Sequence, residues 1–205
     1  REDYIIRAKA AAYILQNNPQ LDRDMERRIQ TLGRLIEALP ETPHPRDLTA
    51  YITLCLCHIK RRCNLFFLAR QGEPLPGDEL SMYLDELAEL ARYGGVNTLI
   101  RCGKVGALKL RGAALCYDFA FETISWTLRE KATPLMGYLN AEGAQLVFRF
   151  LPGGDPGQWR FSQELVAAVT ALGGQIACKD LDGAYGICLT VPLGGEACGW
   201  VLPFS

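Results

Sequence analysis

The sequence predicts an α+β protein in which a helical N-terminal region with a helical hairpin precedes a two-layer α/β sandwich. Two patterns predict this class. Before Gly95 the apolar residues recur three or four positions apart, which is the spacing of amphipathic helices. After Gly95 the pattern changes to strand, helix, hairpin, helix and hairpin, an order that builds a sheet covered by helices. The 205 residues suffice for one large domain or two small ones.

Four helices are expected before Gly95, and they span residues 2–17, 22–39, 46–70 and 78–93. Pro19 ends the first helix, and Asp22 is suited to cap the second. The third helix is the longest and carries a wide apolar stripe that includes Ile59 and Phe66. A stripe of this width needs a partner helix, either in the same chain or in a second chain.

The sandwich is expected to contain strands at residues 96–100, 134–139, 145–151, 175–178 and 186–193, and helices at residues 108–131 and 161–172. Gly173 and Gly174 end the second of these helices, because glycine readily adopts the left-handed conformation that closes a helix. Asp182-Gly183, between two alternating runs, predicts a tight hairpin turn.

Composition excludes several classes of function. The net charge of −1 provides no basic surface for nucleic acid. The longest apolar runs are far shorter than the ~20 residues that cross a bilayer, and no signal peptide is recognisable. The chain begins at Arg1 and not at Met, so we expect a fragment that is cytoplasmic, either by itself or as the cytoplasmic part of a membrane protein. In the second case membrane contact comes only through a preceding part.

The chain has eight cysteines, a number that suggests disulfides or metal. Most lie in apolar stretches where small buried hydrophobic residues are expected: Cys55, Cys57, Cys116, Cys178 and Cys188. Cys55, Cys57, His58 and Cys63 look like a zinc set, but Cys55 and Cys57 are about 200° apart on a helix and cannot share an ion. We therefore expect no metal site, and free thiols in this number favour a reducing compartment.

The closing stretch, from Ala171 to Gly195, reads helix, Leu-Gly-Gly, strand, Asp-Gly, strand and Val-Pro-Leu. This order resembles the end of the ATP-binding domain of sensor histidine kinases, in the GHKL ATPase superfamily. The elements from Val96 to Leu193 match that domain in order. The resemblance implies three parts: a helical segment of unclear role at 1–45, a dimerisation-like helical hairpin at 46–95, and a histidine-kinase-like ATPase domain at 96–205.

In such kinases the first long helix of the ATPase domain carries E-x-x-x-N, in which Glu is the base and Asn holds magnesium. The resemblance places Glu122 on the Glu, but Trp126 stands where the Asn belongs. An indole has no oxygen, and magnesium requires oxygen ligands. We expect Trp126 to be buried in the space of the nucleotide, beside a closed or small pocket. The alternative for Glu122 is an ordinary exposed helix glutamate.

The next motif of the family is D-x-G-x-G, whose Asp binds adenine. Here the sequence reads Asp155-Pro156-Gly157-Gln158-Trp159, so Asp155 and Gly157 are a weak remnant of that motif and Trp159 replaces its last Gly. An ordinary turn explains the same residues. Only Gln158, Trp159 and Arg160 then precede the next helix, which leaves no room for the lid that covers ATP in the family.

Some family members carry a phosphoacceptor motif, H-D-x-x-N, on the first helix of the hairpin. The local match is Lys60-Arg61-Arg62-Cys63-Asn64, with Lys60 in place of His. His58 is a candidate acceptor if the alignment shifts, although a single histidine beside an apolar face is usually structural. The basic run itself is either a solvated face or a patch for an acidic partner.

We therefore expect a histidine-kinase-like protein of a two-component signalling system, a pseudokinase without ATP or metal that acts through dimerisation and protein contacts. One alternative is an active ATP- and magnesium-dependent histidine kinase with an unconventional site, with Glu122 as base and His58 as acceptor. Another is a non-enzymatic interaction domain that reuses the scaffold. The expected partners are a second copy of the chain, bound through helices 46–70 and 78–93, and a response regulator or another kinase.

Overall fold

The computed structural model describes residues 23–157, 159–180 and 184–193. Within them the helices are α2 (Arg23–Ala38), α3 (Pro45–Gln71), α4 (Gly77–Tyr93), α5 (Leu110–Glu130) and α6 (Gln163–Ala171). The strands are β1 (Thr98–Cys102), β2 (Leu135–Glu142), β3 (Gln145–Pro152), β4 (Gln175–Asp180) and β5 (Tyr185–Pro192). The α+β class is confirmed. The helix expected at 2–17 and the Asp182-Gly183 turn lie outside the described residues.

The strands form one mixed sheet in the order β1-β2-β3-β5-β4. β1 runs parallel to β2, and the other neighbouring pairs are antiparallel. The long connection from β1 to its parallel neighbour is α5, as a parallel pair requires. The β2–β3 hairpin places Tyr138 opposite Arg149, and Arg149 forms an ion pair with Glu142 across the same hairpin.

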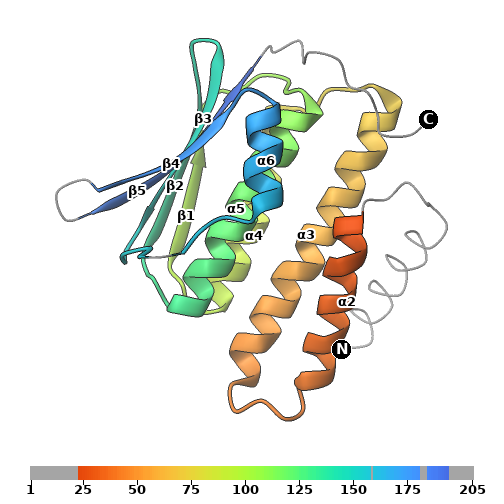
Figure 1. The fold of residues 1–205 in the computed structure, drawn as a ribbon, viewed down its shortest axis with the longest axis vertical. Coiled ribbons are helices and arrows are strands. Elements are labelled where there is room, and N and C mark those ends of the chain that lie inside the picture. Colours follow the sequence, from red (N-terminus) through yellow and green to blue (C-terminus); the bar gives the residue numbers. More distant parts are fainter. Residues whose placement is uncertain (1–22, 158, 181–183, 194–205) are drawn as a thin grey trace.

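The helices cover one face of this sheet in two successive layers (Figure 1). α4, α5 and α6 lie next to the strands, and α3 and α2 lie farther out. α5 is buried nearly all round because the sheet packs on one side of it and α3 on the other. Its Phe119 packs against Phe148 and Phe150 of β3, with ring centroids 5.5 and 5.6 Å away.

The hairpin α3–α4 shares its hydrophobic core with the sandwich. Leu54 of α3, Leu84 of α4 and Phe148 of β3 belong to one cluster of buried side chains. A second cluster joins α2 to the outer side of α3 and includes Met25, Leu32 and Ile59. The wide stripe of α3 therefore has partner helices within the same chain. The division into parts at residues 45 and 95 stays a prediction.

The cysteines follow the expectation that they are buried only in part. The seven cysteines of the described residues are free thiols. Of the five cysteines expected to be buried, Cys57 and Cys116 are buried and Cys55 and Cys188 are only partly buried. Cys178, on the edge strand β4, is exposed. Among the described residues no group of three or more metal-ligating side chains comes together. In the same part of the chain, the helices are too short or too polar to cross a membrane.

Candidate functional site

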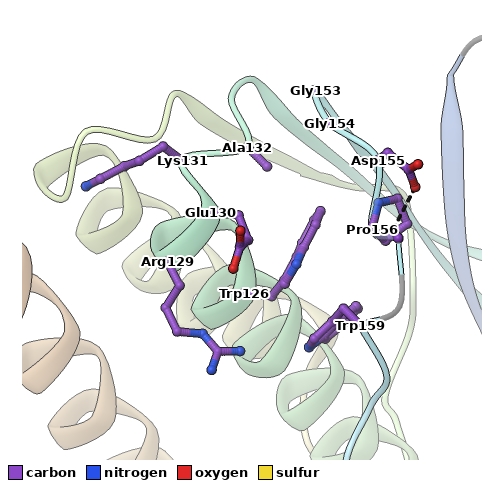
Figure 2. Close-up of a pocket in the computed structure, with 11 residues that line it drawn as sticks. Trp126, Arg129, Glu130, Lys131, Ala132, Gly153, Gly154, Asp155, Pro156 and Trp159 are labelled. Carbon is purple, nitrogen blue, oxygen red and sulfur yellow. Dashed lines mark hydrogen bonds between the residues drawn. The ribbon is translucent and has the colours of Figure 1, made fainter.

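Two tryptophans meet at the positions where the resemblance expects an asparagine and a glycine. Trp126 comes from the last turns of α5, and Trp159 comes from the loop between β3 and α6. Their ring centroids are 5.3 Å apart with an interplanar angle of 22°, so the two indoles are stacked (Figure 2). Trp126 is 3% exposed. Neither ring offers an oxygen ligand for a cation.

Further aromatic rings continue from this pair into the core. The ring of Trp159 lies 4.4 Å from that of Phe161, and Phe161 lies 5.1 Å from Phe119 of α5. Phe119 in turn contacts the phenylalanines of β3. The loop between β3 and α6 is therefore fixed to α5 by a continuous row of aromatic contacts.

An open pocket of about 680 Å³ lies beside the stacked pair. Its lining comes from the end of α5, residues 129–132, and from the loop residues 153–157, together with the two tryptophans. Trp126 is thus buried as expected, but the expectation of a closed or small pocket beside it is wrong. The aromatic row occupies one wall only, and the loop bends away from the end of α5 on the other side (Figure 2).

The pocket is lined by two cations, Arg129 and Lys131, and two carboxylates, Glu130 and Asp155. Lys131 points away from it, because its Nζ binds Asp47 Oδ1 at 2.9 Å and the carbonyl of Gly94 at 3.0 Å (Figure 2). Glu130 and Asp155 line opposite sides.

Asp155 and Gly157, the remnant of the adenine motif, bind each other. The amide of Gly157 donates to Asp155 Oδ1 at 2.6 Å, which closes a turn of the Asx type. Gly157 has φ of +55°, a conformation that favours glycine. Gly153 is required at the start of the loop, since a Cβ there would lie 2.2 Å from the carbonyl oxygen of Thr133. These contacts explain Asp155 and Gly157 as parts of an ordinary turn, without a role in binding adenine.

Glu122 lies one turn before Trp126 on α5 and caps the start of α6. Its two oxygens accept hydrogen bonds from the backbone amide of Ser162 at 2.8 Å and from the Ser162 hydroxyl at 2.5 Å. Ser162 is the N-cap of α6 and accepts from the amide of Leu165. Burial raises the pKa of Glu122, and the bonds from Ser162 partly oppose that shift. Glu122 is not part of the pocket lining.

His58 of α3 is buried against α5. Its ring is 1% exposed and stacks on Phe121, 4.0 Å between centroids, and on Tyr117, 5.4 Å away. Nε2 lies 2.7 Å from Asp118 Oδ1. Burial lowers the pKa of His58 to about 4, although Asp118 favours the charged form. As a phosphoacceptor, which stays a prediction, His58 would have to leave this stack.

Sequence reasoning missed Asp118, which joins two helices. It binds His58 and lies 3.3 Å from the Arg62 guanidinium, so the carboxylate is ionised and its pKa is lowered. No sequence signal pairs Asp118 with His58, because the two are 60 positions apart on different helices.

The basic run on α3 forms ion pairs with neighbouring helices. Lys60 and Arg61 bind the two oxygens of Glu86 on α4 at 3.0 and 2.7 Å. The Arg61 guanidinium also lies 4.2 Å above the ring of Tyr83. Together with the Arg62–Asp118 pair, these contacts use all three cations to fix α3 to α4 and α5. A patch for an acidic partner is the less supported of the two expectations.

No protein-family model and no curated protein matches the chain. Among solved structures, the histidine kinase domain of the blue-light activated histidine kinase EL346 from Erythrobacter litoralis matches with a TM-score of 0.56 and 12% identity, over 94% of this chain and 95% of that one. A longer structure of the same kinase gives 0.47 and 13%, over 84% of this chain and 63% of that one. The histidine kinase ThkA, solved with the response regulator protein TrrA, gives 0.44 and 11%, over 94% of this chain and 66% of that one. The TM-score of 0.56 to the first of these structures shows that the chain has the fold of a histidine kinase domain.

Proposed function

We propose that the chain is the kinase-like part of a sensor histidine-kinase-like signalling protein with a degenerate nucleotide site. Its role is regulatory and depends on protein contacts within a two-component pathway. The observation that carries the proposal is the stacked pair of Trp126 and Trp159. These residues stand at the two positions where an active site of this fold needs a magnesium ligand and a glycine next to the nucleotide.

Three further features support a lost nucleotide function. First, only residues 153–162 lie between β3 and α6, and of these Trp159 and Phe161 pack on Trp126 and Phe119 of α5, so this short connection leaves no length for a segment that covers a ligand. Second, Lys131 at the adjacent pocket is held by Asp47 and the carbonyl of Gly94, so it is not directed at a phosphate there. Third, both oxygens of Glu122 are occupied by Ser162, so Glu122 stabilises the start of α6 and is not poised as a base.

The open pocket beside Trp126 supports a second candidate, an active ATP-dependent histidine kinase with an unconventional site. That function needs magnesium held by some ligand other than Trp126, and an acceptor histidine that reaches the nucleotide. His58 is stacked between α3 and α5 and does not line this pocket. The non-enzymatic interaction domain differs from our proposal only in its partners.

A homodimer and a response regulator or another kinase remain the proposed partners. The stripe of α3 that suggested dimerisation is used within the chain, because Ile59 is 2% exposed and packs in the cluster with Met25 and Leu32 of α2. A dimer built on that stripe would require α2 to move away. The exposed Phe67 of α3 and Met82 of α4 could contact a second copy without such a change.

Incubation with γ-labelled ATP and magnesium, followed by detection of acid-labile phosphate on the chain, tests the proposal. We expect no incorporation above the background of a heat-denatured sample, with an active histidine kinase as the positive control. Labelling that His58→Gln removes would contradict the proposal and establish the active kinase with His58 as acceptor.

A further inference from the structure

The apolar contacts of α2 are with α3 alone. The buried side chains of Met25 and Leu32 pack against Ile59 and its apolar neighbours on α3. Among the described residues, every member of this cluster comes from α2, the adjoining Leu39 or α3. In the same part of the chain, the larger cluster that joins α3, α4, α5 and the sheet contains no residue of α2. The stripe of α3 is therefore an apolar surface that α2 covers from outside, apart from the core of the sandwich.

Carboxylates of α5 and α6 border this apolar surface, and two adjacent cations of α2 face them. Arg27 Nη1 lies 3.4 Å from Glu164 Oε1 of α6, and the Arg28 guanidinium lies over α5. Burial raises the pKa of Glu122 of α5, and the charge of Arg28 is one of the effects that oppose this shift. Burial also acts on Asp118, but neighbouring cations, Arg28 among them, outweigh it and lower the pKa. The surface thus matches a helix with an apolar stripe beside two cations.

The attachment of α2 is incomplete. A pocket of about 240 Å³ lies where α2 meets α3 and α5. The side chains of Arg27 and Glu164 are 62% and 54% exposed, so their ion pair contributes little to stability. Residues 39–44, which include two prolines, connect α2 to α3. We therefore expect α2 to separate from α3 by local opening, without unfolding of the sandwich.

We define the α2-binding surface by the residues that face α2: Ile52, Ile59, Cys63, Asp118, Glu122 and Glu164. We propose that this surface is a docking site for a basic amphipathic helix of a partner protein, and that α2 is an intramolecular competitor that keeps the site closed. The partner helix lays its apolar stripe on α3 and its cations against α5 and α6, as a helix does in an apolar groove. A tethered helix competes at an effective concentration of about 1 mM, so the partner binds once α2 is released.

This inference names a partner for the regulatory role proposed above and rests on that role. Binding at the α2-binding surface is measured without nucleotide. A failure to bind therefore contradicts this inference alone and leaves the degenerate nucleotide site as proposed.

Fluorescence anisotropy with a labelled peptide of residues 23–39 tests the proposal, because this peptide carries the required stripe and cations. The chain with Arg27→Glu and Arg28→Glu provides an open surface, since the reversed charges are repelled by the carboxylates of α5 and α6. We expect saturable binding to this variant chain. The parent chain should bind at least ~10-fold more weakly, because its own α2 occupies the site. Amide shifts of the ¹⁵N-labelled variant chain should fall on α3, α5 and α6.

Three variants of the peptide separate the charge from the apolar stripe. Arg28→Glu reverses a charge that faces α5 and should weaken binding to the variant chain at least ~10-fold. Arg34→Glu is the matched control, because it makes the same reversal at an exposed position about 200° round the helix from Leu32. It should bind like the parent peptide. Leu32→Glu replaces a buried contact with α3 by a charge and should abolish binding.

Four results would overturn the proposal. These are no saturable binding to the variant chain at millimolar peptide, equal binding to the parent chain, equal affinity of the Arg28→Glu and Arg34→Glu peptides, and a dimeric variant chain in light scattering. The last result would assign the surface to a second copy. If the variant chain does not fold, hydrogen exchange of the parent chain decides. Amides of α2 should then exchange at least ~100-fold faster than those of α5, and equal protection would show that α2 does not open by itself.

Discussion

Truncation of Trp126 to alanine measures how much its buried, stacked ring contributes to the free energy of unfolding. A tryptophan buries about 150–250 Å², which at about 25 cal/mol per Å² corresponds to roughly 4–6 kcal/mol of unfolding free energy. Trp126 is 3% exposed, so nearly all of that area counts. Because the pocket beside Trp126 is open, water can enter the space that the truncation leaves and Trp159 can move into it, which lowers the cost. We therefore expect Trp126→Ala to lower the unfolding free energy by ~3–5 kcal/mol.

Urea unfolding followed by circular dichroism provides the measurement, and a double-mutant cycle with Trp159→Ala isolates the stack. A stacked aromatic pair contributes about 0.5–1.5 kcal/mol beyond burial, so the two losses should be non-additive by that amount. Phe161→Ala is the matched control, since the Phe161 ring contacts Trp159 but has no ring contact with Trp126. Its loss should therefore add to that of Trp126→Ala. A loss below ~1 kcal/mol for Trp126→Ala, or full additivity with Trp159→Ala, would refute the filled site.

Three other perturbations have defined outcomes. Because the pKa of folded His58 is lowered to about 4 from 6.5, the unfolded chain binds an extra proton between these values, and stability should fall as pH drops through that window. His58→Phe should remove up to roughly 3 kcal/mol of that fall in acid unfolding curves; an unchanged pH slope would contradict the neutral buried ring. Ser162→Ala removes the N-cap of α6 and a donor to Glu122, so thermal unfolding should show a loss of ~1–2 kcal/mol, and no loss would mean that this network is not formed. Ile59→Glu should unfold the chain, because it places a charge between α2 and α3. Ile36→Glu, the same substitution at a side chain of α2 that is 40% exposed, should leave stability within about 0.5 kcal/mol. If light scattering finds the parent chain dimeric and a stable Ile59→Glu chain monomeric, Ile59 instead lies at a dimer contact.

Most elements of the fold could be predicted because their boundaries have local causes. The helix expected at 78–93 is Gly77–Tyr93, and the strand expected at 145–151 is Gln145–Pro152. Apolar spacing sets the type of each element, and glycine or proline marks its end. Gly72, with φ of +73°, closes α3 in the left-handed conformation.

The docking of the helices could not be predicted, since an apolar stripe shows that a partner exists but not which one. The stripe of α3 fits a second chain as well as it fits α2, and only the structure assigns Ile59 to a contact with α2. Similarly, Trp126 and Trp159 could each be recognised as a departure from a motif. Nothing in their spacing shows that the two rings stack on each other.

The contacts of the candidate site depend on pairs far apart in the sequence. Glu122 could be placed on the family's glutamate, but its role as a cap of α6 depends on Ser162, 40 positions away. His58 stood out as a candidate, yet its burial and its pairing with Asp118 follow from α3 lying on α5. Such roles need the three-dimensional arrangement, because each residue alone allows several of them.

A calorimetric titration of the chain with ATP, in the presence and absence of magnesium, tests the degenerate site most directly. The parent chain and Trp126→Asn are compared, because the substitution restores a magnesium ligand but not the lid. We predict no heat of binding for either protein at physiological ATP concentration, with or without the metal. Magnesium-dependent ATP binding of micromolar affinity by the parent chain would contradict the account.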